Sequence, residues 1–348
     1  MNVHIFLDEK FVGKYIEFID RSFEKSDHIF LILCSGRKLR FPGVYSDLDN
    51  VVVIHKSLRG FFDFVRYTLF GEKIIFHGVF VKGVAFLLGF KCIAKKTYVV
   101  LWGGDIYGSE KAPRYWNNIK HRLLSRCAGI TCELEEDYYL ACRVYNTNAP
   151  YFESMLYLSN VIDEQDFQVE KNCKKSNKIN VLVGNSADPE NNHFYLLEKL
   201  IPYAKNIKLI VPLSYGNQTY ADEVEAYIKT RFESDSCILR TFLPVEEYKK
   251  ILKSIDIAVF AHDRQQALGN TFQLLSFGAK VFIKENTTTY KWMHRKNIRV
   301  FSVDNLEALG SDFLKPMSNI EIENNREIIY RLANEKELYD SWKRIFDD

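Results

Sequence analysis

Short runs of β-branched and other apolar residues alternate with stretches of helical character through most of the chain. The first set is VHIFL, IFLILC, NVVVIH, KIIFHGVF, TYVVLWG and GITC, and the second set is INVLVGNS, IKLIVPLS, CILRTFL, DIAVFAH and KVFIKE. Such alternation is typical of βαβ units, whose strands form parallel sheets. The pattern therefore restricts the chain to an α/β architecture, and its two sets predict two domains.

A polar stretch without apolar periodicity, DEQDFQVEKNCKKSNK at 163–178, separates the two sets of strands. Charged residues, Asn and Ser in such a stretch are typical of an interdomain linker. We expect a first Rossmann-like domain over residues 1–160, a linker over 161–178 and a second Rossmann-like domain over 179–319. A helical tail over 320–348 is expected to pack back towards the first domain.

Charge and cysteine content exclude several classes of protein. The formal net charge is only +2 over 348 residues, so we expect no nucleic-acid partner of the histone-like kind. The seven cysteines form no CxxC or zinc-type spacing, which favours buried thiols in a reducing cytoplasm. The start of the chain lacks the features of a signal peptide, and the longest apolar stretch, 79–94, is interrupted by two lysines. A soluble or peripheral protein is expected.

Several common catalytic signatures are absent from the sequence. It contains no GxGxxG, Walker A, GxSxG or HExxH pattern. The remaining candidates are polar residues at the ends of predicted strands, where open α/β folds bind their ligands.

Two such junctions lie in the first domain. In LWGGDIYG, residues 101–108, Asp105 follows two glycines, and its carboxylate could act in catalysis or could cap the following helix. The residue types alone favour neither interpretation. His77 follows the strand KIIFH, and a lone histidine in an apolar run is more often a core residue.

Two further junctions lie in the second domain, and both have the character of an anion site. The segments VLVGNSADPENNH and DIAVFAHDRQQALGN each run from a strand through a polar turn into a helix start. Free backbone amides at a helix start, together with an arginine, can hold a diphosphate. Each junction is a weak indication by itself, whereas two of them in one domain favour a nucleotide ligand.

Five motifs resemble, in the same order, those of glycosyltransferase family 56. They are HGVF, WGGDIYG, LVGNSADPENNH, IVPLSYGN with YADEVEAYI, and FAHDRQQALGN. The resemblance extends from residue 73 to residue 279, whereas residues 1–70 match only in their strand pattern. That family transfers 4-acetamido-4,6-dideoxygalactose (Fuc4NAc) from a TDP-sugar to a polyprenyl-diphosphate-linked saccharide in enterobacterial common antigen synthesis.

The resemblance implies a GT-B fold, with two facing Rossmann-like domains built on parallel sheets. The first domain would hold the lipid-linked acceptor and the second the TDP-sugar donor. It further implies a bacterial hexosyltransferase of surface polysaccharide synthesis, of the enterobacterial common antigen or O-antigen kind. The enzyme would invert the anomeric centre, need no metal or other cofactor, and act as a peripheral protein on the cytoplasmic face of the inner membrane.

The resemblance also assigns roles to particular residues. Asp105 becomes the first choice for the general base and His77 the second. The residues expected to bind the nucleotide sugar are Gly184, Asn185, Ser186, Tyr215, Asn217, Arg264, Gln265, Gln266, Gly269, Asn270 and Thr271.

One segment has the charge expected of a membrane-facing surface. Residues 56–126 contain thirteen Lys and Arg against four Asp and Glu. Within this segment, LRGFFDFVRYTLFG at 58–71 resembles an interfacial amphipathic helix. Its aromatic residues could instead face the core, but the surrounding basic charge favours contact with anionic lipid. The residues expected to contact the membrane or acceptor are Arg59, Phe61, Phe62 and Arg66.

Two other functions are compatible with the same architecture. A sugar-nucleotide 2-epimerase with a GT-B fold also binds a nucleoside diphosphate sugar, but it needs no lipid-facing surface. A non-catalytic partner that binds a glycan or a nucleotide sugar is the third possibility.

Overall fold

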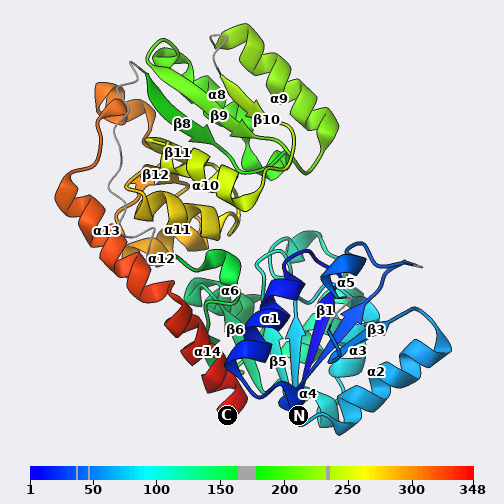
Figure 1. Ribbon diagram of the computed structural model, residues 1–348. Helices are drawn as coiled ribbons and strands as arrows, with labels where there is room; N and C mark the ends of the chain where they lie inside the picture. Colours follow the sequence, from blue (N-terminus) through cyan, green and yellow to red (C-terminus); the bar gives the residue numbers. More distant parts are fainter. Residues whose placement is uncertain (37, 46–47, 164–177, 233–235) are drawn as a thin grey trace. The chain divides into compact units, whose positions relative to one another are not determined.

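The computed structural model describes residues 1–36, 38–45, 48–163, 178–232 and 236–348. These residues form two compact units (Figure 1). The first unit consists of Met1–Ser159 with Glu335–Asp348, and the second consists of Asn160–Asn334. In each unit, helices cover both faces of a parallel sheet.

The first unit is built on a seven-stranded parallel sheet with the order β3-β2-β1-β4-β5-β6-β7. Its strands are β1 (Asn2–Leu7), β2 (His28–Leu33), β3 (Val51–Ile54), β4 (Lys73–His77), β5 (Thr97–Val100), β6 (Gly129–Cys132) and β7 (Tyr151–Glu153). Its helices are α1 (Val12–Ser22), α2 (Leu58–Phe70), α3 (Lys82–Leu88), α4 (Lys91–Ala94), α5 (Arg114–Leu124), α6 (Glu135–Tyr145) and α14 (Glu335–Asp347).

The second unit is built on a six-stranded parallel sheet with the order β10-β9-β8-β11-β12-β13. Its strands are β8 (Ile179–Val183), β9 (Ile207–Pro212), β10 (Cys237–Leu239), β11 (Ile257–Phe260), β12 (Lys280–Ile283) and β13 (Phe301–Ser302). Its helices are α8 (His193–Leu200), α9 (Gln218–Arg231), α10 (Val245–Lys253), α11 (Leu268–Ser276), α12 (Thr288–Arg295) and α13 (Asn319–Leu332).

The central strands have the composition that a sheet covered on both faces requires. All four residues of β5, β6, β11 and β12 are buried, and most of them are Val, Ile or another large apolar residue. Each apolar run named in the sequence contains an observed strand, so the prediction of two parallel-sheet α/β domains is confirmed. The sequence did not reveal the edge strands β7 and β13, which have only three and two residues.

Strand order reverses direction at one place in each sheet. In the second unit, β8 pairs with β9 on one side and with β11 on the other. Open α/β sheets bind ligands at this switch point, beyond the carboxyl ends of the two strands. The loops that follow β8 and β11 carry most of the residues expected to bind the nucleotide sugar.

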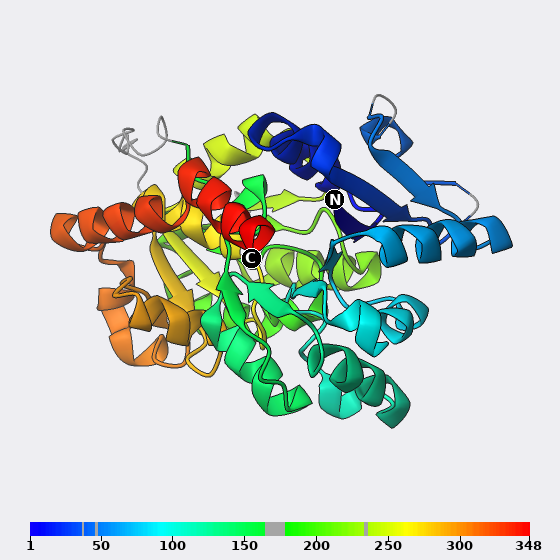
Figure 2. The same cartoon turned by 90° about the horizontal axis from the view of Figure 1, so that it is seen from below.

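The segment 320–348 is divided between the two units. In the second unit, the Arg326 guanidinium on α13 donates to the Ser276 carbonyl at the end of α11, at 2.8 Å. In the first unit, α14 packs along β7 (Figure 2), and the Trp342 indole donates to the Leu156 carbonyl at 3.2 Å. Only α14 therefore clusters with the first unit. Most of the linker expected over 161–178 lies outside the described residues.

Candidate functional site

Asn191 connects the two loops at the switch point of the second unit. Its side-chain oxygen accepts from the Asn185 backbone amide at 2.8 Å and from His262 Nε2 at 2.9 Å. Its side-chain nitrogen donates to Ser186 Oγ at 3.2 Å and to the Asp188 carbonyl at 3.1 Å. Asn191 is fully buried, so this one amide fixes the loop after β8 against the loop after β11.

The imidazole of His262 is neutral in this network. Burial, followed by the positive charge of Arg264, lowers the pKa of His262 to about 3. Because Asn191 presents an oxygen to it, Nε2 must carry the proton. His262 therefore serves as a fixed donor that positions the loop after β11.

Gly184 occupies a position that no other residue fits. Its φ is +66°, and an added Cβ would lie 2.6 Å from His193 Nε2 and 2.8 Å from Asn191 Oδ1. Glycine allows this left-handed turn and the close approach of the buried side chains. This turn places Asn185 and Ser186 just beyond the carboxyl end of β8.

Helix α11 begins next to this network with an open first turn. Its N-cap, Ala267, has a φ of +58° and supplies no side-chain cap. The amides of Gly269 and Asn270 belong to this first turn, whereas the Thr271 amide already donates to the Ala267 carbonyl at 2.9 Å. The helix thus starts before Gly269, and the amides of its first turn form an anion-binding end.

Arg264 forms ion pairs with two acidic residues within the unit. Its guanidinium donates to Glu190 Oε2 and lies 3.7 Å from Asp188 Oδ2. Asp188 also caps the Glu190 amide at 3.0 Å, so the turn at 189–191 is already capped by a carboxylate. Arg264 would have to exchange these partners to bind a diphosphate, and the first turn of α11 is the better anion site.

Three buried side-chain oxygens at this edge have no hydrogen-bond partner among the described residues. They are Asn185 Oδ1, Gln266 Oε1 and Thr289 Oγ1. Gln266 lines a cavity of about 10 Å³ with His262 and Arg264. Leaving a buried acceptor unpaired typically costs about 1 to 3 kcal/mol, so these atoms indicate where a ligand or a water donates. The adjacent Gln265 accepts from Arg264 through its carbonyl.

Two exposed aromatic rings flank the same edge. Tyr215 and Phe242 stack with ring centroids 5.5 Å apart and are 44% and 60% exposed. Asn185 Nδ2 donates to the Tyr215 hydroxyl at 3.0 Å. Asn217 caps α9 by accepting from the Tyr220 amide. A stacked, exposed pair beside an unpaired acceptor can hold a flat ring such as a nucleobase.

The side chains of Asn270 and Thr271 form hydrogen bonds to other residues of the second unit. Asn270 Nδ2 donates to the Tyr248 hydroxyl at 3.1 Å, and Thr271 Oγ1 donates to the Ala267 carbonyl at 3.0 Å. These two residues therefore contribute to the site mainly by shaping the first turn of α11.

Asp105 is enclosed in the first unit. It is only 1% exposed, and its two carboxylate oxygens accept from the amides of Trp102 and Val79, each at 3.0 Å. Lys120 Nζ donates to the Asp105 carbonyl. Burial raises the pKa of Asp105, while these backbone amides counteract the shift. The carboxylate thus ties the turn after β5 to the turn after β4.

His77 is fully buried in a cluster of rings. Its imidazole stacks on Phe6 at a centroid distance of 3.6 Å, and Nδ1 lies 3.0 Å from the Tyr157 hydroxyl. Its Nε2 lies 3.4 Å from Nδ1 of His4. Burial holds the pKa of His77 well below its usual value, so the ring is neutral. These contacts are those of a satisfied core histidine.

Several aromatic residues of α2 face outward. Phe61 and Phe62 are 48% and 67% exposed, whereas Phe64 is buried. Arg59 and Arg66 are exposed on the same helix. Helix α2 therefore presents a mixed aromatic and basic surface. Among the described residues, no helix is long and apolar enough to cross a membrane.

Sequence reasoning did not select several residues that the fold places at the site. These are Asn191, His262, Phe242 and Tyr248. Asn191 and His262 stand in the motifs that carried the resemblance, which was the available signal. Phe242 and Tyr248 follow β10, and no local pattern linked them to the other loops.

Comparison with solved structures reveals the fold. Anabaena HepE in complex with UDP matches with a TM-score of 0.73 at 10% identity, over 100% of each chain. A glycosyltransferase from Rickettsia africae matches with a TM-score of 0.68 at 12% identity, over 99% of this chain and 97% of that one. A UDP-forming trehalose-phosphate synthase from Burkholderia xenovorans matches with a TM-score of 0.64 at 6% identity, over 100% and 98%. The chain has the GT-B fold.

Comparison with protein families identifies the group. The model of the 4-alpha-L-fucosyltransferases, glycosyl transferase group 56, matches residues 69–319. This range includes the turn around Asp105 and the whole switch-point site of the second unit. The chain therefore belongs to glycosyltransferase group 56.

Proposed function

We propose that the protein transfers a deoxy-acetamido sugar of the Fuc4NAc kind from a TDP-sugar to a polyprenyl-diphosphate-linked saccharide. The reaction would belong to the synthesis of a bacterial surface polysaccharide. The observation that carries the proposal is the switch-point site of the second unit. There, the oxygens of Asn185 and Gln266, for which the described part of the chain offers no partner, lie on the loops next to the open first turn of α11.

Charge development in the reaction matches the groups at this site. Cleavage of the sugar–phosphate bond leaves negative charge on the nucleoside diphosphate and positive character on the anomeric carbon. The amides of Gly269 and Asn270 at the start of α11 would stabilise that anion. Arg264 would add its charge after exchanging Glu190 for the diphosphate. These groups could stabilise the leaving group without a metal, and metal independence stays a prediction.

The base is proposed to belong to the first unit. Inversion requires a group that takes the proton of the acceptor hydroxyl. Asp105 remains the first candidate and His77 the second. Because Asp105 is engaged by two backbone amides, the base role requires the turns after β4 and β5 to open. The contacts themselves favour a turn-forming role, and the Asp105 variant described below distinguishes the two.

Helix α2 would contact the membrane that carries the lipid-linked acceptor. Its exposed Phe61 and Phe62, with Arg59 and Arg66 beside them, fit an interface with anionic lipid. The proposed location is the cytoplasmic face of the inner membrane, where TDP-sugars and the polyprenyl-linked acceptor meet.

Direct assay with defined substrates tests the proposal. The purified chain is incubated with TDP-Fuc4NAc and a polyprenyl-diphosphate-linked saccharide, and the lipid fraction is analysed by mass spectrometry. The expected product is the acceptor enlarged by one Fuc4NAc residue, together with free TDP. Isomerised donor in the absence of acceptor would indicate an epimerase. Tight TDP-sugar binding without product would indicate a non-catalytic partner, and a second incubation with EDTA tests metal independence.

A further inference from the structure

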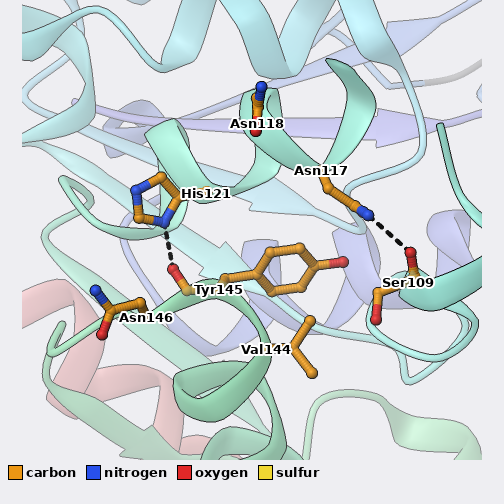
Figure 3. Close-up of a pocket in the computed structure, with 7 residues that line it drawn as sticks. All are labelled: Ser109, Asn117, Asn118, His121, Val144, Tyr145 and Asn146. Atoms are coloured by element: carbon orange, nitrogen blue, oxygen red, sulfur yellow. Dashed lines mark hydrogen bonds between the residues drawn. The ribbon is translucent and has the colours of Figure 1, made fainter. Parts of the chain in front are cut away.

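The first unit contains a polar hollow that the proposed donor site does not use. It has a volume of about 470 Å³ and lies between α5 and α6 (Figure 3). Helix α5 contributes Asn117, Asn118 and His121, and the end of α6 contributes Tyr145 and Asn146. This volume falls within the range of small-molecule sites in proteins, about 300 to 1,000 Å³.

Tyr145 carries a buried hydroxyl that no described residue of the protein satisfies. The residue is only 2% exposed, and its hydroxyl oxygen has no partner among the described residues. Figure 3 shows the ring lying across the hollow, with the hydroxyl on the side of Ser109 and Asn117. A tyrosine buried to this degree usually finds a partner for its hydroxyl. The absence of such a partner among the described residues indicates that a ligand or a water molecule supplies it.

Asn117 supplies a second unsatisfied atom in the same hollow. Its Nδ2 donates to the Ser109 carbonyl at 2.7 Å, which fixes the orientation of the amide. Its Oδ1 is then an acceptor, and it is buried without a partner among the described residues. The hollow therefore presents one acceptor, and one hydroxyl that can donate or accept.

The rim of the hollow consists of further neutral polar groups. Asn118 and Asn146 are exposed, and Asn146 ends α6 with a φ of +47°. His121 Nδ1 donates to the Tyr145 carbonyl, which fixes the orientation of its ring at the rim. The described lining residues include no Lys, Arg, Asp or Glu. Amides and hydroxyls without a fixed charge suit a ligand with several hydroxyl groups better than they suit a phosphate.

We propose that this hollow binds one uncharged sugar unit of a saccharide, at a place distinct from the nucleotide-sugar site of the second unit. Hydroxyl groups of the sugar would donate to Asn117 Oδ1 and exchange a hydrogen bond with the Tyr145 hydroxyl. Asn118 and Asn146 would contact the remaining hydroxyls. The proposal does not depend on the donor or on the reaction, because it concerns binding to the first unit alone.

Saturation-transfer NMR with N-acetylglucosamine on the full chain tests the proposal. The parent protein is expected to saturate the sugar protons, and Tyr145→Phe is expected to weaken binding at least fivefold. Because the removed hydroxyl has no partner within the described part of the chain, the unfolding temperature of this variant should equal or exceed that of the parent. Asn118→Ala, an exposed substitution on a helix, provides a second variant and should weaken binding several-fold.

A matched variant separates binding from stability. Tyr138 lies on α6, as Tyr145 does, but it does not line the hollow. Its hydroxyl donates to the Ala149 carbonyl at 2.9 Å. Tyr138→Phe is therefore expected to lower the unfolding temperature and to leave sugar binding unchanged. Affinity for TDP should be the same in all three variants, which keeps this result distinct from the proposed donor site.

Three outcomes would overturn the proposal. They are an absence of saturation transfer to the sugar, equal sugar binding by Tyr145→Phe and the parent, and binding of inorganic phosphate in preference to the sugar. The first would mean that the hollow holds only water.

Discussion

Asn191 is the residue on which the geometry of the donor site most depends. Its single amide pairs with the Asn185 amide, the His262 imidazole and the Ser186 hydroxyl. Removing it leaves several buried polar groups unpaired. We therefore expect Asn191→Ala to lower the free energy of unfolding by about 2 to 4 kcal/mol, since each such group costs about 1 to 3 kcal/mol. TDP affinity should fall at least tenfold, because the two loops lose their connection.

Urea denaturation and calorimetry with TDP measure the two effects of Asn191→Ala. Asn324→Ala is the matched control, because Asn324 makes one exposed hydrogen bond to the Asn297 carbonyl in the same unit. The control should change neither quantity by more than the experimental error. Unchanged TDP affinity in a folded Asn191→Ala protein would contradict the positioning role.

Two substitutions at the Arg264–Glu190 ion pair are expected to change TDP affinity in opposite directions. Arg264→Ala should weaken TDP binding at least tenfold, because a charge-assisted contact is worth about 1.5 to 3 kcal/mol. Glu190→Gln should strengthen TDP binding by a few-fold at low salt, because it removes the carboxylate that now holds the guanidinium. Calorimetry at two salt concentrations measures both. The same TDP affinity in the parent and in both variants would exclude Arg264 from the diphosphate site.

Asp105→Asn distinguishes the catalytic role of Asp105 from the turn-forming one. Both carboxylate oxygens accept backbone amides, whereas an asparagine offers one oxygen and one NH₂ group that faces a donor. The substitution should therefore lower the free energy of unfolding by about 1 to 3 kcal/mol in either case. If Asp105 is also the base, single-turnover rates of the folded variant should fall by roughly 10² to 10⁴.

The expected loss of stability determines how the turnover of Asp105→Asn has to be measured. Because a stability loss is expected, turnover has to be measured below the unfolding transition of the variant. Tyr138→Phe, in the same unit and away from the turns after β4 and β5, loses one hydrogen bond to the Ala149 carbonyl and controls for general perturbation. Turnover of Asp105→Asn within a few-fold of the parent would assign Asp105 to the turn alone.

Helix α2 is the element whose exposed face can be tested as a whole. Its aromatic residues Phe61 and Phe62 face solvent beside Arg59 and Arg66. Replacing all four by Ser should abolish most of the salt-sensitive binding to anionic liposomes, because each basic residue near such a surface is worth about 1 kcal/mol. Vesicle sedimentation at low and physiological salt is the measurement.

A control on a different helix shows whether position matters or only charge. Lys336 and Lys343 lie on α14, and each forms an exposed ion pair within that helix. Replacing both by Ser removes the same number of basic residues and should leave liposome binding almost unchanged. Equal recovery of the parent and the α2 variant on vesicles would remove α2 from the acceptor surface.

Helix α14 packs over a row of buried histidines, and we expect these histidines to make the stability of the folded protein depend on pH. His4 lies 3.0 Å from His28, and Phe346 contacts both rings. Burial lowers the pKa of His28 to about 4 and that of His4 well below its usual value. The unfolded chain, with an ordinary histidine pKa of about 6.5, then binds more protons than the folded chain below neutral pH.

The sign of the pH effect follows from this difference. Stability from the neutral histidines is fully present above about pH 6.5 and is lost as the pH falls towards 4, by about 1.4 kcal/mol per pH unit for each histidine. Urea midpoints between pH 7.5 and 5 should decrease accordingly. His28→Phe should reduce this slope, whereas the exposed His294→Gln should not. A slope unaffected by His28→Phe would contradict the assignment.

For the whole molecule, the apolar runs of the sequence are enough to predict the architecture. Parallel strands covered by helices must be apolar on both faces, so runs such as IFLILC and DIAVFAH mark strands without any tertiary information. The two sets of runs and the polar stretch between them then predict two α/β domains. The edge strands β7 and β13 could not be predicted in this way, because a strand of two or three residues is too short to show a periodicity.

Tertiary structure alone decided what the polar residues at the strand ends do. The motifs identified Asp105 and Arg264, but their sequence neighbours could not show that Asp105 holds the Val79 amide or that Arg264 holds Glu190. Both partners are distant in the chain and become neighbours only because β4 pairs with β5 and β8 with β11. The connecting role of Asn191 and the hollow beside Tyr145 arise in the same way. Local sequence specifies periodicity and turn chemistry, whereas the partners of a buried polar group depend on which strands and helices the fold brings together.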